Sequence, residues 1–427
     1  MKERVSAAGA RVLAEIVAQH VEEAATLRNN RALLVRSPAA GLRQLARHDE
    51  RIAAHLDGIR VAGNEGAALA QAAFNAMDKP DAGATFTVLT GLIEQRASGA
   101  ALDLLQRLHD AAAAPCAARG AASAVGWVSA ADLRGVVMPW LADGGPLARW
   151  LALSACTLHR VDPGPTLARL LADSDPRVQQ RACQAAGELG RRDLIDAVSG
   201  PRGRGDSSEL GFVRTRTALL LGDRGPALEH VHALALEAGP HQHQAVGLTM
   251  LFGDAERGRH VVGALAKTAA GAAQRRLVIA ASGWSGDPRV VPWLVQQMAD
   301  ETLARLAADA FAAITGASFS APPLERLHRA AAPPGDDPID LDEDDALPWP
   351  AADNVQTWWA TEAPRFAAGT RHLLGHPADA AQVQRVLVEG TQRQRMQAAL
   401  LGTAMRPGTP LFNVAAPAWR QQRSLAA

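Results

Sequence analysis

The chain has 427 residues, and its 44 basic and 44 acidic side chains leave it without formal net charge. Hydrophobic residues make up 48% of it, chiefly Ala and Leu, whereas aromatic residues make up 4% and Tyr is absent. This composition favours closely packed helices over sheets, because Ala and Leu are strong helix formers and β-branched residues are in the minority. The balanced charge argues against a nucleic-acid partner, whose binding needs a cluster of Lys and Arg.

Residues 1–114 predict a helical N-terminal region. Apolar residues recur at helical spacing over 12–21 and are interrupted by Glu15 and His20, which is typical of an amphipathic helix and not of a secretion signal. A break falls at Ser37-Pro38, and further helices are expected at 42–58, 67–77, 85–95 and 102–109. No stretch of 18 uncharged apolar residues occurs, so we expect no membrane span and a cytoplasmic protein.

From residue 115 to 332 a short pattern returns every 30 to 34 residues. Each unit consists of an Ala-rich first helix, a turn at an anchor residue, and a second helix with bulky aliphatic residues. The anchors are Gly126, Arg160, Gly190, Gly222, Gly253, Gly286 and Gly316. Glycine at a helix end suits the left-handed conformation that terminates a helix. Self-similarity at a fixed period predicts an array of stacked units.

Helix starts within this array have their own signal. In Asp175-Pro176 and Asp287-Pro288 the Asp can cap the helix, and Pro stands at the first helical position, where it needs no N–H. Unit length and helix content indicate a HEAT-like α-solenoid, a right-handed superhelix of helical hairpins. The ankyrin T-P-L-H signature is absent, and the aromatic-rich tetratricopeptide pattern cannot be built from so few aromatics.

The predicted fold class is therefore all-α, with four parts. They are the N-terminal helical region (1–114), the HEAT-like array (115–332), an acidic Pro-rich insertion (333–354), and a C-terminal helical repeat and cap (355–427). Helices are expected at 355–360, 378–389 and 391–405 in the last part. The proline-broken tail that follows is expected to lie along the last helices as an end cap, because an exposed solenoid end needs covering.

The insertion contains the first candidate site. Asp340, Asp342 and Asp344 have the alternate spacing of a calcium loop, but the glycine at position six and the glutamate at position twelve are missing, which excludes an EF-hand. A solvated linker is the favoured interpretation of this acidic run. A docking site for a basic partner is the alternative.

An aromatic cluster adjoins the acidic run. Trp349, Trp358 and Trp359 make up a third of the nine Trp residues. Neighbouring residues on a helix lie about 100° apart, so we expect that Trp358 and Trp359 do not both face one core. Structural packing is the favoured interpretation, since Trp is usually buried. The alternative is that they bind a partner. In that case Trp349, Trp358 and Trp359, together with Asp340, Asp342 and Asp344, are the candidate partner-binding residues.

Neither a metal, a cofactor nor a catalytic motif is expected. Cys116, Cys156 and Cys183 are unclustered and are expected to be small buried residues. The histidines at 230, 232, 241 and 243 have i, i+2 spacing, which points them to different sides of a helix. The arginines of the array differ in their repeat positions and predict a scattered solvated face. The sequence contains no G-x-S-x-G, no phosphate loop with G-K-[ST] and no His-Glu dipeptide.

Four stretches resemble an uncharacterised family of proteobacterial HEAT-repeat proteins. They read RQLARHDERIAAHLDGIRVAG (43–63), LPWPAADNVQTWWA (347–360), GTRHLLGHP (369–377) and RPGTPLFNVAAPAWRQQR (406–423). The family has no assigned activity, and some of its members are encoded beside spike components of type VI secretion systems. The resemblance implies a scaffolding or accessory role in the cytoplasm.

We therefore expect a non-catalytic protein-binding scaffold or adaptor, whose partner is another protein such as a secretion component. Two alternatives stay open. One is an enzyme on the same scaffold, lyase-like in its chemistry, which a polar pocket with converging His, Arg and carboxylate groups would favour. The other is a solenoid that binds nucleic acid.

Overall fold

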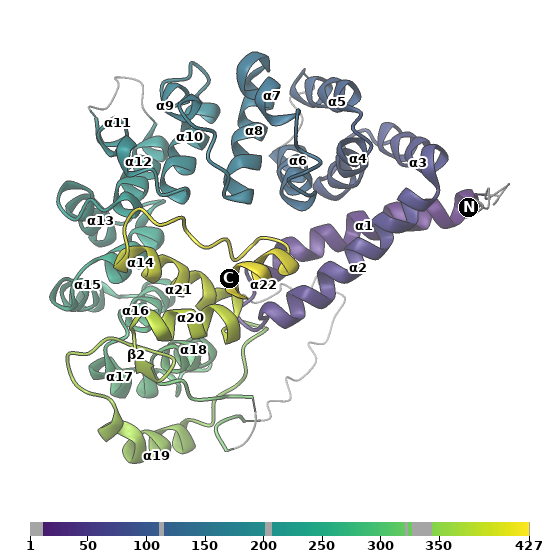
Figure 1. The fold of residues 1–427 in the computed structure, drawn as a ribbon. Coiled ribbons are helices and arrows are strands. Elements are labelled where there is room, and N and C mark those ends of the chain that lie inside the picture. The colour runs from purple at the N-terminus through teal and green to yellow at the C-terminus, as the bar shows by residue number, and fades with distance from the viewer. Residues whose placement is uncertain (1–11, 111–114, 201–206, 321–322, 327–343, 427) are drawn as a thin grey trace. The chain divides into compact units, whose positions relative to one another are not determined.

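The structure is a computed structural model of the chain, and it describes residues 12–110, 115–200, 207–320, 323–326 and 344–426. Within them lie 22 α-helices, three short 3-10 helices and one two-stranded hairpin. The prediction of an all-α protein is confirmed. Figure 1 labels the elements along the chain. The chain divides into two compact units, and each is described by itself.

Unit 1 comprises Met1–Arg36, Arg43–Ala185 and Ala415–Ala427. Its helices are α1 (Ala14–Leu34), α2 (Leu42–Val61), α3 (Gly63–Asn75), α4 (Ala82–Glu94), α5 (Ser98–Asp110), α6 (Pro115–Trp127), α7 (Val137–Asp143), α8 (Pro146–His159), α9 (Thr166–Leu170) and α22 (Ala418–Ala426). Helix α4 packs against α1, α3, α5 and α6, and α8 packs against α5, α6 and α7. Asp81 caps α4 by accepting a hydrogen bond from the Ala84 N–H.

Unit 2 comprises Ser37–Leu42 and Ala186–Val414. Helix α10 (Pro176–Glu188) spans the division between the units. The other elements are η1 (Arg192–Leu194), α11 (Ile195–Ser199), α12 (Ser208–Leu221), α13 (Pro226–Leu236), α14 (Gln242–Phe252), α15 (Ala255–Thr268), α16 (Ala272–Ser285), η2 (Pro288–Val290), α17 (Val291–Gln297), α18 (Ala304–Thr315), α19 (Ala352–Glu362), η3 (Ala363–Arg365), β1 (His372–Leu373), β2 (His376–Pro377), α20 (Ala380–Glu389) and α21 (Gln392–Met405).

The helices of unit 2 form consecutive hairpins. Helix α14 packs against α13, α15 and α16, and α16 packs against α15 and α18. The two predicted Asp-Pro starts are present, because α10 begins at Pro176, and the Asp287 carboxylate accepts a hydrogen bond from the Arg289 N–H at the start of η2. Helices α14 and α16 are the first helices of successive units. Each of them contacts the first helix of the next unit, and α14 also contacts the second helix of its own unit.

Most anchor residues end their first helix in the predicted conformation. The backbone φ is positive at Arg160, Gly190, Gly222, Gly286 and Gly316. The left-handed prediction is wrong at Gly126 and Gly253. Gly126 lies inside α6, where an added Cβ would come within 2.8 Å of Leu158 Cδ1, and Gly253 is extended with φ −86°. Glycine at 126 therefore serves close helix packing and not a turn.

The chain beyond α19 covers the ends of first helices in unit 2. The hairpin of β1 and β2 pairs antiparallel, with Leu373 opposite His376. At its turn the Leu374 and Gly375 N–H groups donate to the Ala313 and Ile314 carbonyls, at 2.8 and 2.9 Å. These carbonyls lie in the last turn of α18 and have no partner within their own helix. The hairpin therefore completes the end of α18.

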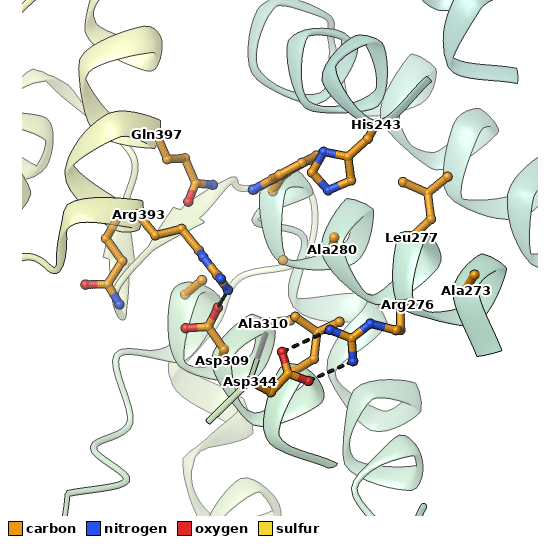
Figure 2. A pocket seen from close by; sticks show the side chains of 15 residues that line it. His243, Ala273, Arg276, Leu277, Ala280, Asp309, Ala310, Asp344, Arg393 and Gln397 are labelled. Atoms are coloured by element: carbon orange, nitrogen blue, oxygen red, sulfur yellow. Dashed lines mark hydrogen bonds and ion pairs between the residues drawn. The ribbon is translucent and has the colours of Figure 1, made fainter. Parts of the chain in front are cut away.

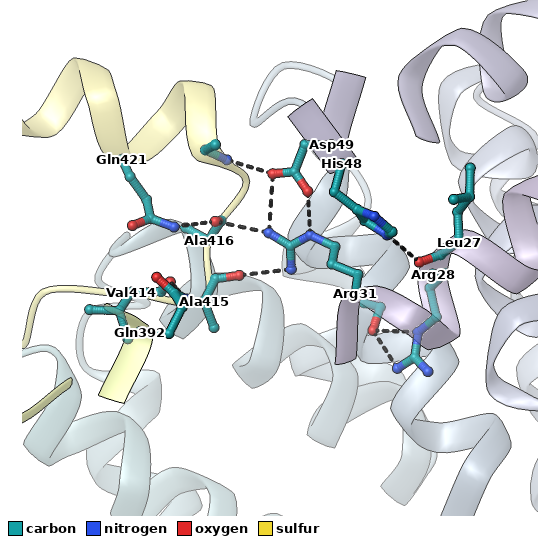
Figure 3. A network of polar contacts seen from close by, with 12 residues as sticks. Leu27, Arg28, Arg31, His48, Asp49, Gln392, Val414, Ala415, Ala416 and Gln421 are labelled. Atoms are coloured by element: carbon teal, nitrogen blue, oxygen red, sulfur yellow. Dashed lines mark hydrogen bonds and ion pairs between the residues drawn. The ribbon is translucent and has the colours of Figure 1, made fainter. Parts of the chain in front are cut away.

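Part of the tail lies against the last helices, because the Gln392 side chain of α21 donates to the Val414 carbonyl. In unit 2 the Leu411 N–H donates to the Glu188 carbonyl at the end of α10. In unit 1 the last helix, α22, is held by the guanidinium of Arg31, which donates to Asp49 and to the carbonyls of Ala415 and Ala416 (Figure 3). The tail thus carries polar groups that bond to helices of the preceding chain.

Candidate binding pocket

The structure describes four of the six predicted site residues; Asp340 and Asp342 lie outside the described residues. Asp344 is only 3% exposed. It accepts two hydrogen bonds from Arg276, with Nη1–Oδ2 2.7 Å and Nη2–Oδ1 3.0 Å. A solvated carboxylate is therefore the wrong expectation for Asp344, because a bidentate guanidinium replaces the water that it loses on burial.

The three tryptophans are partly buried and pack against other side chains of unit 2. The guanidinium carbons of Arg305 and Arg326 lie 4.7 and 5.4 Å from the Trp349 ring centroid, which is cation–π geometry. Trp358 and Trp359 both contact the buried Phe311, with ring centroids 5.6 and 6.2 Å from it. The expectation that these two rings cannot face one core is therefore wrong. Each indole is long enough to reach the same phenyl ring from its own side of the helix.

A pocket of about 510 Å³ lies beside Asp344 in unit 2. Helices α14, α16, α18 and α21 supply its walls. Small residues create the space, because Ala273, Ala280 and Gly283 recur along one face of α16, and Ala310 and Ala313 along one face of α18. An added Cβ at Gly283 would lie 3.0 Å from Ala310, which shows how closely the two helices approach at one end of the pocket.

Two Arg–Asp ion pairs border the pocket (Figure 2). One is the Arg276–Asp344 pair. In the other, Arg393 Nη1 donates to Asp309 Oδ2 at 2.7 Å. Burial raises the pKa of the Asp309 carboxyl, and the neighbouring Arg393 opposes this shift by favouring the charged form. The two pairs balance in charge, so these four side chains leave the pocket without net charge.

Helix α21 contributes polar groups that the described residues do not satisfy. Gln397 lines the pocket and is 9% exposed, yet its side-chain amide makes no hydrogen bond with any described residue. The Nε and Nη2 groups of Arg393 likewise have no acceptor among the described residues. Arg393 is 37% exposed, and the polar atoms of both side chains stay accessible to solvent, so a ligand in the pocket can bond to them.

The remaining lining is aromatic and aliphatic. His243 meets the Trp284 ring edge-on, with centroids 5.0 Å apart, and Leu277 adds an apolar surface. Of the lining residues, sequence analysis singles out Asp344 as a binding candidate and predicts the helix at 391–405. A further signal is the i, i+4 spacing of Arg393 and Gln397, which places both side chains on one face of that helix.

A second pocket, of about 690 Å³, lies in unit 1 and includes His159 and Arg420. Arg420 donates to the carbonyls of Gly126 and Val128 at 2.9 and 3.2 Å, and His159 Nε2 bonds to the Val125 carbonyl at 2.8 Å. Burial, with a smaller contribution from Arg420, lowers the pKa of His159 to about 4. Both side chains are engaged in holding the end of α6.

Among the described residues, no group of three or more His, Cys, Asp or Glu side chains is arranged to hold a metal ion. In the same part of the chain, no helix combines the length and apolar character that crossing a membrane requires.

Comparisons with protein-family models, with curated proteins and with solved structures give no match for this chain. The resemblance to proteobacterial HEAT-repeat proteins therefore stays a prediction.

Proposed function

We propose that this chain is a non-catalytic, cytoplasmic protein-binding scaffold built from HEAT-like helical hairpins. The packing of α14 on α16, and of α16 on α18, supports the HEAT-like arrangement, as does the repeated left-handed helix end. In the proposed fold these hairpins continue into a right-handed solenoid. Stacked hairpins suit binding, because each unit adds a few contacts to an extended surface.

The observation that carries the proposal is the unsatisfied polar edge of α21 in the pocket. Gln397 and Arg393 present an amide and a guanidinium edge beside apolar side chains of α16 and α18. A polypeptide segment offers the matching groups, since its backbone carries both donors and acceptors and its side chains supply apolar surface. The volume lies in the range of binding sites that enclose small ligands or side chains.

The partner in this proposal is another protein, such as a component of a type VI secretion system. The resemblance of four stretches to proteins encoded beside such systems supports that choice. The stable pairing of both aspartates with arginines also favours binding over turnover, because it leaves neither carboxylate unpaired at the pocket.

Affinity capture from the native host tests the proposal. The wild-type chain serves as bait and is compared with two variants. Ala280→Phe fills the pocket, and Ala272→Phe adds the same ring at an exposed position of α16 outside the pocket. We expect one partner that wild type and Ala272→Phe retain and Ala280→Phe loses. A capture without any protein above background, or one that Ala280→Phe leaves unchanged, contradicts the proposal.

A lyase-like enzyme is the second candidate, because His243, Arg276 and Asp309 do line one pocket. A ligand that copurifies with the protein separates the two functions when it is incubated with fresh protein and analysed by mass spectrometry. An enzyme alters the ligand chemically, and a scaffold leaves it intact. A nucleic-acid-binding solenoid, the third possibility, requires an affinity that falls steeply with salt concentration.

A further inference from the structure

We propose that the pocket binds a carboxylate with an adjacent amide and an apolar side chain, the groups that the C-terminal residue of a peptide presents. This inference rests on the proposed protein-binding function for the source of the ligand. The chemical groups assigned to the ligand are argued from the geometry of Arg393, Gln397 and the apolar wall of the pocket.

Arg393 supplies the carboxylate receptor. Its Nη1 is used by Asp309 at 2.7 Å, while its Nε and Nη2 have no acceptor among the described residues. These two nitrogens lie on one edge of the planar guanidinium, and their spacing matches the two oxygens of a carboxylate. The side chain is 37% exposed and reaches into the pocket (Figure 2), so a ligand can approach this edge.

Gln397 supplies the amide receptor. It follows Arg393 by four residues on α21, and both side chains therefore leave the same face of the helix. A glutamine amide has two donors and an acceptor, so it can bond to both the N–H and the C=O of a peptide group. The residue is only 9% exposed, so a ligand bonded to its amide would displace most of the water around that group.

The opposite wall of the pocket favours an apolar side chain on the ligand, and the charge balance of the pocket limits the ligand's negative charge. Leu277, Ala280 and Ala310 line this side of the pocket. Each arginine of the pocket already has an aspartate, so one further carboxylate leaves a single excess negative charge, whereas a polyphosphate would leave several. The site therefore favours a single carboxylate on an apolar residue.

N-acetyl-L-leucine is the minimal probe, because it joins a carboxylate, an acetamide and an aliphatic side chain in one small molecule. Titration calorimetry or ligand-observed NMR on the full chain measures its binding. N-acetyl-L-leucinamide removes the carboxylate, and we expect it to bind at least tenfold more weakly. The α-amide of N-acetyl-L-glutamic acid carries its carboxylate on the side chain. Tighter binding of N-acetyl-L-leucine indicates a chain end as the source of the carboxylate, and tighter binding of the glutamic acid α-amide indicates an acidic side chain.

Two variants test the assigned groups. Arg393→Lys keeps a charge for Asp309 but lacks the paired donors, and we expect at least a tenfold loss of affinity. Gln397→Leu breaks no ion pair and should fold normally, and we expect a severalfold loss. Arg385→Lys is the matched control, because Arg385 is exposed on α20 and does not line the pocket; its affinity should equal that of wild type.

Absence of saturable binding to wild type, equal affinity for N-acetyl-L-leucine and its amide, or full binding by both pocket variants overturns the inference. If the probe fails while Ala280→Phe still abolishes partner capture, the ligand chemistry is wrong and the protein-binding function stands. If the probe binds and no partner is captured, the inference stands and the proposed function falls.

Discussion

The contact of the C-terminal hairpin with the end of α18 makes Gly316 a sensitive position. Gly316 ends α18 with φ +70°, and an added Cβ would lie 2.6 Å from the Leu374 carbonyl oxygen and 3.1 Å from the Gly375 nitrogen. Real Cβ atoms essentially never lie within 3.0 Å of such an atom, so the contact with the Leu374 oxygen forces the backbone to move. Gly316→Ala must therefore strain the left-handed residue and also push the hairpin away from α18.

The two effects have separate magnitudes. Left-handed backbone costs a residue with a Cβ about 1–2 kcal/mol. Displacement of the hairpin removes two backbone hydrogen bonds, from Leu374 and Gly375 to α18, each worth about 0.5–1.5 kcal/mol. Gly316→Ala should then lower the free energy of unfolding by about 2–5 kcal/mol.

Gly369→Ala is the matched control. Gly369 lies in the same unit with φ +85°, and an added Cβ there would meet nothing within 4 Å. It therefore tests the backbone strain alone, and we expect a loss of about 1–2 kcal/mol.

Urea unfolding of the full chain, followed by circular dichroism, measures both variants, and hydrogen exchange of residues 372–377 reports on the hairpin itself. We expect faster exchange of the hairpin in Gly316→Ala than in wild type. Equal losses of stability in the two variants, with unchanged hairpin exchange, would refute the close-approach explanation.

Two further outcomes follow from the buried polar groups. Asp344→Asn should lower the free energy of unfolding by about 1–3 kcal/mol because it breaks the buried pair with Arg276, whereas Asp345→Asn, whose side chain is 50% exposed, should cost under about 1 kcal/mol; urea unfolding checks both. The pKa of His159 falls from 6.5 to about 4 on folding, so below pH 6.5 the unfolded chain binds a proton that the folded chain does not, and up to about 3 kcal/mol of stability is lost between pH 6.5 and 4. His159→Gln keeps a donor for the Val125 carbonyl and should flatten this part of the stability–pH curve, and an unchanged slope would contradict the assignment.

The helices could be predicted because their signals are local. The Asp175-Pro176 start depends on adjacent residues, and most glycine anchors lie at the helix end that they mark. The repeat spacing predicts Arg160 as an anchor although it is not a glycine, and its φ of +57° confirms the position. Arg96 has the same φ at the end of α4, 30 residues before Gly126, but no glycine marks that helix end in the sequence.

The pocket could not be predicted because its parts meet only in the folded chain. The acidic run around Asp344 predicts a solvated carboxylate, because no nearby residue indicates its pairing with Arg276, 68 residues earlier. The pairing of Arg393 with Asp309 spans 84 residues and likewise leaves no local trace. Sequence patterns show which side chains share one face of a helix. Which other helix covers that face depends on tertiary packing.

The most direct test of the binding claim places a photoreactive benzoylphenylalanine at Leu277, on the pocket wall, and compares it with the same residue at the exposed Ala272. After irradiation in the native host, mass spectrometry maps the crosslinked peptides. Our account predicts one protein crosslinked at 277 through a single short segment, and no such product at 272. Identical crosslinking at both positions, or none at 277, would contradict it.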